Sequence, residues 1–259
     1  MLDKPPGTPL WVDIASPDPD ATAAFYGGLF GWKSEEAGPP EETGGYRLFR
    51  KDGKIVAGHG RQQNDHQPVV WVTYISTDDA DGVAAGVKEN GGQVVLEPFD
   101  VLDQGRMGVF TDPPGAAFAC WQPKQNTGAE LFNEPGSLTW NELATRDAEG
   151  SKPFYSAVFG WTPSDTPMSD VTYTIWNLGD RGIAGMIEMD EQWPPEIPPH
   201  WMVYFAVGDA EAAAERAKEL GGTVSVPPTD LPGVGRFAVL NDTQGAFFSL
   251  MQPAPREGQ

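Results

Sequence analysis

Cysteine and histidine are both scarce in this chain of 259 residues. The one cysteine, Cys120, excludes a disulfide framework within the chain. Its apolar neighbours, Phe-Ala-Cys-Trp, favour a buried, inert thiol over a nucleophile. The three histidines are His59, His66 and His200. They restrict metal chemistry, because a non-haem iron site takes two histidines and a carboxylate.

Positive charge and long apolar runs are also lacking. The 17 Lys and Arg residues face 37 Asp and Glu residues, for a net charge of −20. This balance disfavours a surface for nucleic-acid phosphates. No apolar run approaches the roughly 18 residues of a membrane span, and the first residues show no signal-peptide pattern. We therefore expect a cytoplasmic protein, a monomer or homodimer, that binds a small molecule and neither nucleic acid nor membrane.

What the sequence does contain is a long internal repeat. Residues 7–32, GTPLWVDIASPDPDATAAFYGGLFGW, return at 136–161 as GSLTWNELATRDAEGSKPFYSAVFGW. Each copy predicts a strand, a helix capped by Asp18 or Asp147, and a closing glycine turn. A repeat of this length indicates a duplicated architecture.

Each half also contains a second block with the same order of elements. Residues 68–123 predict a strand, a helix capped by Asp79 and further strands, and residues 199–253 follow the same course. We therefore predict an α+β fold of two tandem domains, in which blocks pair to bury their sheets. The predicted boundaries are 1–123 for the first domain (modules about 7–60 and 68–123), 124–135 for a linker, 136–253 for the second domain (modules about 136–189 and 199–253) and 254–259 for a tail.

Two sequence strings resemble those of a known superfamily. They are D-x₆-FY-x₃-FGW, from Asp18 to Trp32, and the DPPG and DTQG turns before the last strand of each half. Both are similar to the glyoxalase/bleomycin-resistance/extradiol-dioxygenase (vicinal oxygen chelate) superfamily, and the resemblance extends to a two-domain actinobacterial subgroup. It implies paired βαβββ modules that form a curved mixed sheet around a cleft. Because one fold hosts many chemistries, function has to be argued from the site residues.

The resemblance also implies where a metal would be held. In the superfamily, His, Gln or Glu side chains from the first and last strands of paired modules usually bind a divalent metal. The corresponding positions here hold mostly residues that cannot bind one, namely Trp11, Val72, Ala119, Trp140, Met202 and Ser249. A catalytic site needs about three protein ligands, so we predict no cofactor. The alternative is a divalent metal bound by His59, His200 and Glu188.

Aromatic residues recur near these positions. A pocket rimmed by indoles suits a flat apolar or aromatic metabolite, although the same tryptophans could instead be core residues. The predicted ligand-binding residues form equivalent pairs: Trp11 and Trp140, Trp71 and Trp201, Tyr74 and Tyr204.

A carboxylate follows the first tryptophan of each copy by two residues. Strand alternation puts Asp13 on the face of Trp11, and Glu142 on the corresponding face. A carboxylate in an apolar groove can act as a general acid or base. We predict Arg106 and Arg236, which are equivalent, as ion-pair partners of these carboxylates or as groups that hold an anionic substrate oxygen.

Three functions follow from these residues. The first is a metal-free enzyme, a lyase or oxidoreductase, that catalyses proton transfer, hydration or hydroxylation of a small apolar or aromatic metabolite. The second is a non-catalytic protein that sequesters an antibiotic or metabolite. The third is a metal-dependent glyoxalase or dioxygenase. A buried carboxylate beside a cavity favours catalysis, an acidic cleft favours binding, and an ordered ligand set favours the metal.

Overall fold

The computed structural model describes residues 4–168 and 171–255. The first half contains β1 (Pro9–Ser16), α1 (Pro19–Phe30), β2 (Lys33–Glu36), α2 (Pro40–Thr43), β3 (Arg47–Lys51), β4 (Lys54–Arg61), β5 (Trp71–Ser76), α3 (Ala80–Glu89), β6 (Gln93–Val101), β7 (Gly105–Thr111) and β8 (Ala117–Pro123). The second half contains β9 (Leu138–Thr145), α4 (Ala148–Phe159), β10 (Thr162–Met168), β11 (Val171–Leu178), β12 (Arg181–Glu188), β13 (His200–Ala206), α5 (Ala210–Glu219), β14 (Thr223–Leu231), β15 (Gly235–Asn241) and β16 (Phe247–Pro253).

Each half forms one eight-stranded mixed sheet. The strand orders are β2-β3-β4-β1-β5-β8-β7-β6 and β10-β11-β12-β9-β13-β16-β15-β14, which are equivalent strand for strand. Two modules therefore contribute four strands each to a sheet. The predicted α+β fold of duplicated, paired modules is confirmed.

The helices begin where the sequence predicts. The Asp18 side chain accepts hydrogen bonds from the backbone N–H groups of Asp20 and Ala21, and the Asp147 side chain accepts one from Gly150. α1 and α4 then end at glycines in the left-handed conformation, with φ of 73° at Gly31 and 69° at Gly160. These caps satisfy backbone donors and acceptors that a helix end leaves open.

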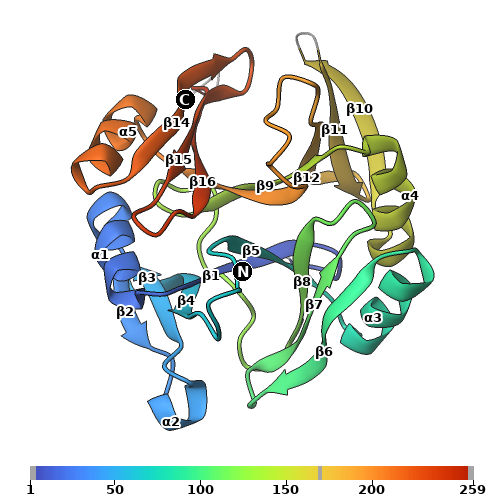
Figure 1. The fold of residues 1–259 in the computed structure, drawn as a ribbon, viewed down its shortest axis with the longest axis horizontal. Helices are drawn as coiled ribbons and strands as arrows, with labels where there is room; N and C mark the ends of the chain where they lie inside the picture. The colour runs from blue at the N-terminus through green and yellow to red at the C-terminus, as the bar shows by residue number, and fades with distance from the viewer. Residues whose placement is uncertain (1–3, 169–170, 256–259) are drawn as a thin grey trace. The chain divides into compact units, whose positions relative to one another are not determined.

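The chain packs into two compact units that each take one module from each half. One unit combines Val72–Gly128 with Trp140–Met202, and α3 lies beside α4 in it (Figure 1). The other combines Val12–Trp71 with the part of the fourth module that follows Met202, and α1 lies beside α5 in it (Figure 1). Within each unit, the two modules pack through their helix-covered faces.

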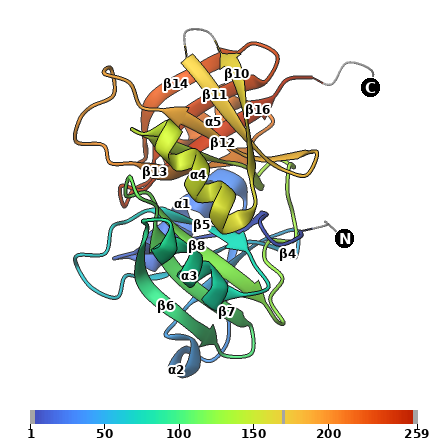
Figure 2. The ribbon, with the colours of Figure 1, turned by 90° about the vertical axis from the view of Figure 1, so that its right-hand side faces the viewer.

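Each unit has its own aromatic core. In the unit of α3 and α4, α3 covers one face of β6–β8 (Figure 2), and the core includes Phe118 from the second module and Phe154 from the third. In the other unit, Phe25 from the first module contacts Phe248 from the fourth, with ring centroids 6.1 Å apart. No helix in residues 4–168 and 171–255 is long and apolar enough to cross a membrane.

Candidate functional site

One face of each module's sheet lies against the module's helix. Side chains alternate between the two faces along a strand, and we call the face away from the helix the inner face. In β1, Val12 and Ile14 point into the core, so Asp13 lies on the inner face. Asp13 is half-buried, and one of its carboxylate oxygens accepts a hydrogen bond from the Tyr46 hydroxyl at 2.8 Å. Trp11 precedes it on the same face and is only 4% exposed.

The third module repeats this carboxylate–phenol pair. Glu142 and Trp140 lie on the inner face of β9 and are both half-buried. The Tyr173 hydroxyl donates to Glu142 Oε2 at 2.7 Å and accepts from Trp140 Nε1 at 2.9 Å. The structure therefore builds an ordered series of indole, phenol and carboxylate on one face of the sheet.

A glycine leaves room for this series. Gly185 on β12 lies opposite Glu142 in the parallel register. A β-carbon at residue 185 would collide with the Tyr173 hydroxyl and approach Trp140 Nε1 to 2.8 Å. Because no larger residue fits without moving Tyr173, Gly185 determines where the phenol can lie.

The electrostatics keep Tyr173 protonated. Burial raises the pKa of the Tyr173 hydroxyl well above its ordinary value, and the negative charge of Glu142 raises it further. A phenol that stays protonated donates continuously to the carboxylate. Glu142 is thereby held in a fixed orientation.

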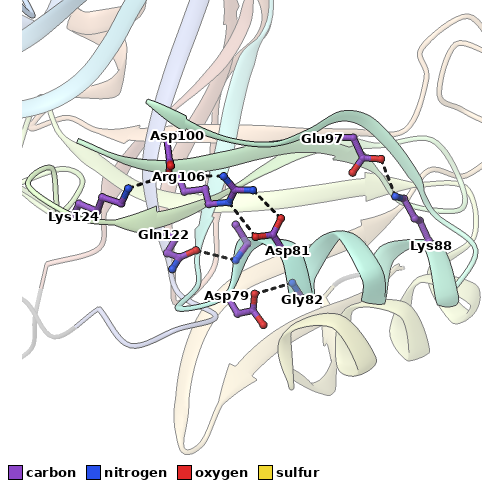
Figure 3. A network of polar contacts seen from close by, with 10 residues as sticks. Asp79, Asp81, Gly82, Lys88, Glu97, Asp100, Arg106, Gln122 and Lys124 are labelled. Carbon is purple, nitrogen blue, oxygen red and sulfur yellow. Dashed lines mark hydrogen bonds and ion pairs between the residues drawn. The ribbon is translucent and has the colours of Figure 1, made fainter. Parts of the chain in front are cut away.

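The two arginines do not pair as predicted. Arg106 forms ion pairs with Asp81 of α3 at 2.8 Å and with Asp100 of β6 at 3.8 Å (Figure 3). Asp100 also binds Lys124 at 3.0 Å, within the same network (Figure 3). Arg106 shares the helix-covered face of β7 with Phe110, so its guanidinium ties the β6–β7 hairpin to α3.

Arg236 is placed in the same way in the fourth module. Its guanidinium lies 2.9 Å from Glu211 of α5 and 3.1 Å from Asp230 of β14. The sequence identified the equivalence of Arg106 and Arg236 but not the face on which they lie. We therefore remove both arginines from the candidate site.

Trp71 and Trp201 are core residues rather than ligand-binding ones, since each packs in one of the two hydrophobic cores. The Trp71 indole donates to the Tyr26 hydroxyl at 2.8 Å, and Tyr26 donates to Asp242 at 3.0 Å. The prediction that these tryptophans rim a pocket is wrong. Their strand alternation directs them to the helices.

The other core repeats this arrangement. Trp201 donates to the Tyr155 hydroxyl at 3.0 Å, and Tyr155 donates to Asp112 Oδ2 at 3.0 Å. Asp112 Oδ1 accepts the backbone N–H groups of Gly115 and Ala116 at 2.9 and 2.6 Å. Burial raises the pKa of the Asp112 carboxyl to about 6 and raises that of Tyr155 well above its ordinary range.

Tyr74 and Tyr204 lie three residues after the core tryptophans and therefore on the inner faces. They are 6% and 7% exposed. Tyr74 is opposite Ala119 of β8, and Tyr204 is opposite Ser249 of β16. Ala119 and Ser249 occupy the positions at which the superfamily would place a last-strand ligand, and their side chains are a methyl and a hydroxymethyl group.

His59 does not lie on the inner face. In the parallel register it pairs with Ile14, a core residue, while Asp13 pairs with Gly58. The His59 ring is fully buried and stacked on Phe49 with a centroid distance of 4.1 Å, and its Nε2 is 2.8 Å from Ser34 Oγ. Burial and the positive charge of Arg47 lower the pKa of His59 to about 4.

The other two residues of the alternative metal set are also separate from the carboxylate–phenol pairs. His200 Nδ1 lies 2.8 Å from the Pro198 carbonyl oxygen, and Glu188 is exposed. Within residues 4–168 and 171–255, no group of three or more His, Cys, Asp and Glu side chains is placed to hold a metal ion. The donor set that these described residues offer does not fit the superfamily's metal.

The comparisons with known proteins agree with this fold. The model of the Glyoxalase/Bleomycin resistance protein/Dioxygenase superfamily matches residues 8–119 and 137–250. The chain belongs to this superfamily.

Two similar proteins span nearly the whole chain. The anthracycline biosynthesis protein DnrV of Streptomyces peucetius is 43% identical over 95% of this chain and 94% of its own length. The "Putative glyoxylase CFP32" of Mycobacterium tuberculosis is 42% identical over 97% of each chain.

Solved structures share the fold at low sequence identity. The Mn(II)-bound glyoxalase from Novosphingobium aromaticivorans has a TM-score of 0.65 and 19% identity, covering 95% of this chain and 82% of its own. The 2,3-dioxygenase LapB from Pseudomonas sp. KL28 has a TM-score of 0.66 and 13% identity, covering 98% and 96%.

Three residues of the candidate site escaped the sequence reasoning: Tyr46, Tyr173 and Gly185. The signal was present, because Tyr46 and Tyr173 occupy matching positions in the two copies. What the sequence did not contain was the register that brings each tyrosine to its carboxylate.

Proposed function

We propose that this protein binds a small aromatic metabolite on its inner faces without a metal, and that a carboxylate of the site transfers a proton. The observation that carries the proposal is the series of Trp140, Tyr173 and Glu142, with hydrogen bonds of 2.9 and 2.7 Å. The half-buried pair of Asp13 and Tyr46 repeats the phenol and carboxylate of this series.

The chemistry follows from the order of these groups. Glu142 can accept a proton from a phenol, an enol or a carbon acid beside a carbonyl group. Tyr173 donates to the carboxylate and fixes its direction, and Trp140 fixes the phenol in turn. A proton accepted by Glu142 can return to another atom of the substrate, which makes the reaction an isomerisation or the proton-transfer step of a hydration.

The relatives support an aromatic ligand. DnrV is named for anthracycline biosynthesis, and it is similar to this chain along nearly its full length. Anthracyclines are polycyclic aromatic compounds that carry phenol and carbonyl groups. These are the groups on which a positioned carboxylate can act.

The ligand positions support a metal-free reaction. Trp11 and Trp140 stand where the superfamily places first-strand ligands, and His59 lies on the helix-covered face. Elemental analysis of the purified protein, produced in medium containing Mn, Fe, Ni and Zn, tests this point. We expect less than about 0.1 equivalent of any transition metal, and one retained equivalent would contradict the proposal.

The test of the chemistry uses hydroxylated anthraquinones and anthrones as probes. Binding is measured by calorimetry, and proton transfer by mass spectrometry of deuterium incorporated from solvent. We expect Glu142→Gln to lower exchange by about 10²-fold or more while the probe still binds. Asp13→Asn is the matched variant of the first half and shows whether one or both copies act.

Sequestration is the second candidate function, and the duplication of the carboxylate–phenol pair favours it. A storage protein benefits from two equivalent sites, whereas a reaction needs only one. Sequestration predicts binding of two probe molecules by the wild type with no exchange above the uncatalysed rate. Exchange that depends on Glu142 or Asp13 would contradict it.

A further inference from the structure

The helix-covered faces of the two halves pack through contacts that are nearly the same in both units. Tyr155 of the third module donates to Asp112 of the second, and Tyr26 of the first module donates to Asp242 of the fourth. A first half carries both Tyr26 and Asp112, so two first halves from different copies could form the same hydrogen bonds. These shared contacts therefore do not determine which halves pack together.

One buried polar contact differs between the units. In the unit of α3 and α4, the hydroxyl of Thr73 on β5 donates to Asn141 Oδ1 on β9 at 3.0 Å, and both side chains are buried. The equivalent residues of the other unit are Val12 of β1 and Val203 of β13, which lie together in its apolar core. One unit thus has a polar pair where the other has an apolar pair.

Packing of equal halves would separate the polar pair. Thr73 of one copy would then face Val12 of another copy when two first halves pack, and Asn141 would face Val203 when two second halves pack. A buried polar group that loses its hydrogen-bond partner is not returned to water, so the loss is costly. These mismatches disfavour the wrong assembly in addition to the favourable contacts of the correct one.

A second difference concerns side-chain size where α1 lies beside α5. A β-carbon at Gly28 of α1 would lie 2.6 Å from Leu220 Cδ2, so Leu220 fills the space beside the glycine. The equivalent residues of the other unit are Ala157 of α4 and Asn90, the C-cap residue of α3. Packing of two second halves would bring the Ala157 methyl group against Leu220, which would have to move.

We propose that these two residue pairs determine which halves pack together, so that a first half packs on a second half and not on the first half of a second copy. Thr73 with Asn141 is the polar match, and Gly28 with Leu220 is the size match. Both matches are lost when equal halves pack. A chain whose two halves each packed on an equal half would bind other copies through both, and such contacts can extend into open assemblies.

The experiment moves the polar residues without changing the composition of the chain. The two-residue variant, Val12→Asn with Asn141→Val, puts the asparagine in the same half as Thr73, so that equal halves match and unequal halves do not. The four-residue variant adds Thr73→Val and Val203→Thr, which restores the match between unequal halves. Each protein is unfolded in urea, refolded at several concentrations and examined by sedimentation velocity.

We expect the two-residue variant to refold into larger assemblies than the wild type, in a fraction that rises with protein concentration. Its equilibrium constant for unfolding should rise about tenfold or more. The four-residue variant should refold to the wild-type species. The nine tryptophans provide a second measurement, since one arrangement gives nine indole signals in a ¹H–¹⁵N spectrum and further signals report another arrangement.

Two results would overturn the inference. One is a two-residue variant that refolds to the wild-type species with unchanged stability. The other is a four-residue variant that aggregates or fails to fold as the two-residue variant does, because the substitutions and not the match would then be responsible. If the two-residue variant does not fold, recovery of the wild-type species by the four-residue variant supports the inference.

The size match is tested by the same kind of exchange. Gly28→Ala with Ala157→Gly puts a methyl group against Leu220, and adding Leu220→Asn with Asn90→Leu moves the larger side chain to the other unit. We expect the first variant to raise the equilibrium constant for unfolding about threefold, since the added alanine favours the helix and offsets part of the collision. The second variant should restore the wild-type value. Equal values for the two variants would remove Gly28 and Leu220 from the inference.

Discussion

The two carboxylate–tyrosine–tryptophan series in one compact unit share their hydrogen-bond order but not their surroundings. In both, an indole donates to a phenol, and the phenol donates to a carboxylate. The series that ends at Asp112 lies in the core, with Tyr155 fully buried. The series that ends at Glu142 lies on the inner face, and its members are half-buried.

The two series differ in their burial and backbone contacts, and not in their set of indole, phenol and carboxylate groups. Asp112 is 1% exposed, and the backbone N–H groups of Gly115 and Ala116 occupy its second oxygen. Through its hydrogen bond with Tyr155, Asp112 joins the second module to α4 of the third. The members of the Glu142 series are partly exposed instead.

The largest expected effect comes from removing the buried carboxylate. Asp112→Ala leaves the Tyr155 hydroxyl and the Ala116 backbone N–H group without their acceptor in the core, while the Gly115 N–H keeps the Asp112 carbonyl oxygen. We expect it to lower the free energy of unfolding by about 3 kcal/mol in urea titrations. Asp242→Ala is the matched change in the other unit. Glu142→Gln is the control and should lower it by less than about 1 kcal/mol.

The stability of the protein should depend on pH through Asp112. Burial raises the pKa of Asp112 from 3.8 to about 6, so the folded state holds this proton more tightly than the unfolded state. Its contribution is complete below pH 3.8 and is lost as the pH rises through 6.

Unfolding of the wild type and of Asp112→Asn is therefore compared between pH 4 and pH 7. The wild type should lose about 2–3 kcal/mol relative to the variant over this range. Parallel curves for the two proteins would show that Asp112 does not titrate there.

Displacing the inner-face phenol should affect ligand binding more than folding. In Gly185→Ala the added methyl group collides with Tyr173 and moves it from Glu142. We expect aromatic probes to bind about tenfold more weakly, with about 1 kcal/mol or less lost in stability. Gly208→Ala, at a glycine without positive φ and with no atom within 4 Å of its β-carbon position, controls for a general glycine effect. Equal probe affinity in wild type and Gly185→Ala would remove Tyr173 from the site.

The smallest effect is expected at the arginine that the sequence assigned to the site. Arg106→Gln breaks contacts with Asp81 and Asp100, whose side chains are largely exposed. Probe affinity should stay within about twofold, since ion pairs at an exposed surface contribute little. A larger loss, measured by calorimetry against Arg236→Gln, would return Arg106 to the candidate site.

The local features of the fold could be predicted from the sequence. The repeat, the helix caps at Asp18 and Asp147 and the closing glycines follow from residues close together in the chain. A strand such as β10, Thr162–Met168, could not be predicted, because its two prolines argue against a strand. It forms at the outer edge of its sheet, where a missing N–H is tolerated.

The candidate site was predictable only in part. Alternation placed Asp13 and Glu142 on the inner face, but the partners of each carboxylate depend on strand register. The predicted roles of Trp71 and His59 failed for a related reason. Both residues lie on helix-covered faces, and the sequence of a single strand does not show which of its faces a helix covers. The pairing of modules across the two halves depends on contacts between residues far apart in the chain, such as Tyr26 with Asp242 and Tyr155 with Asp112.

Deuterium exchange of a hydroxylated anthrone can be followed side by side in Glu142→Gln and Asp112→Asn, under conditions where both are folded. Glu142→Gln should lose exchange by about 10²-fold, and Asp112→Asn should retain it. Retained exchange in Glu142→Gln, together with its loss in Asp112→Asn, would place the reaction at the buried carboxylate and not at Glu142.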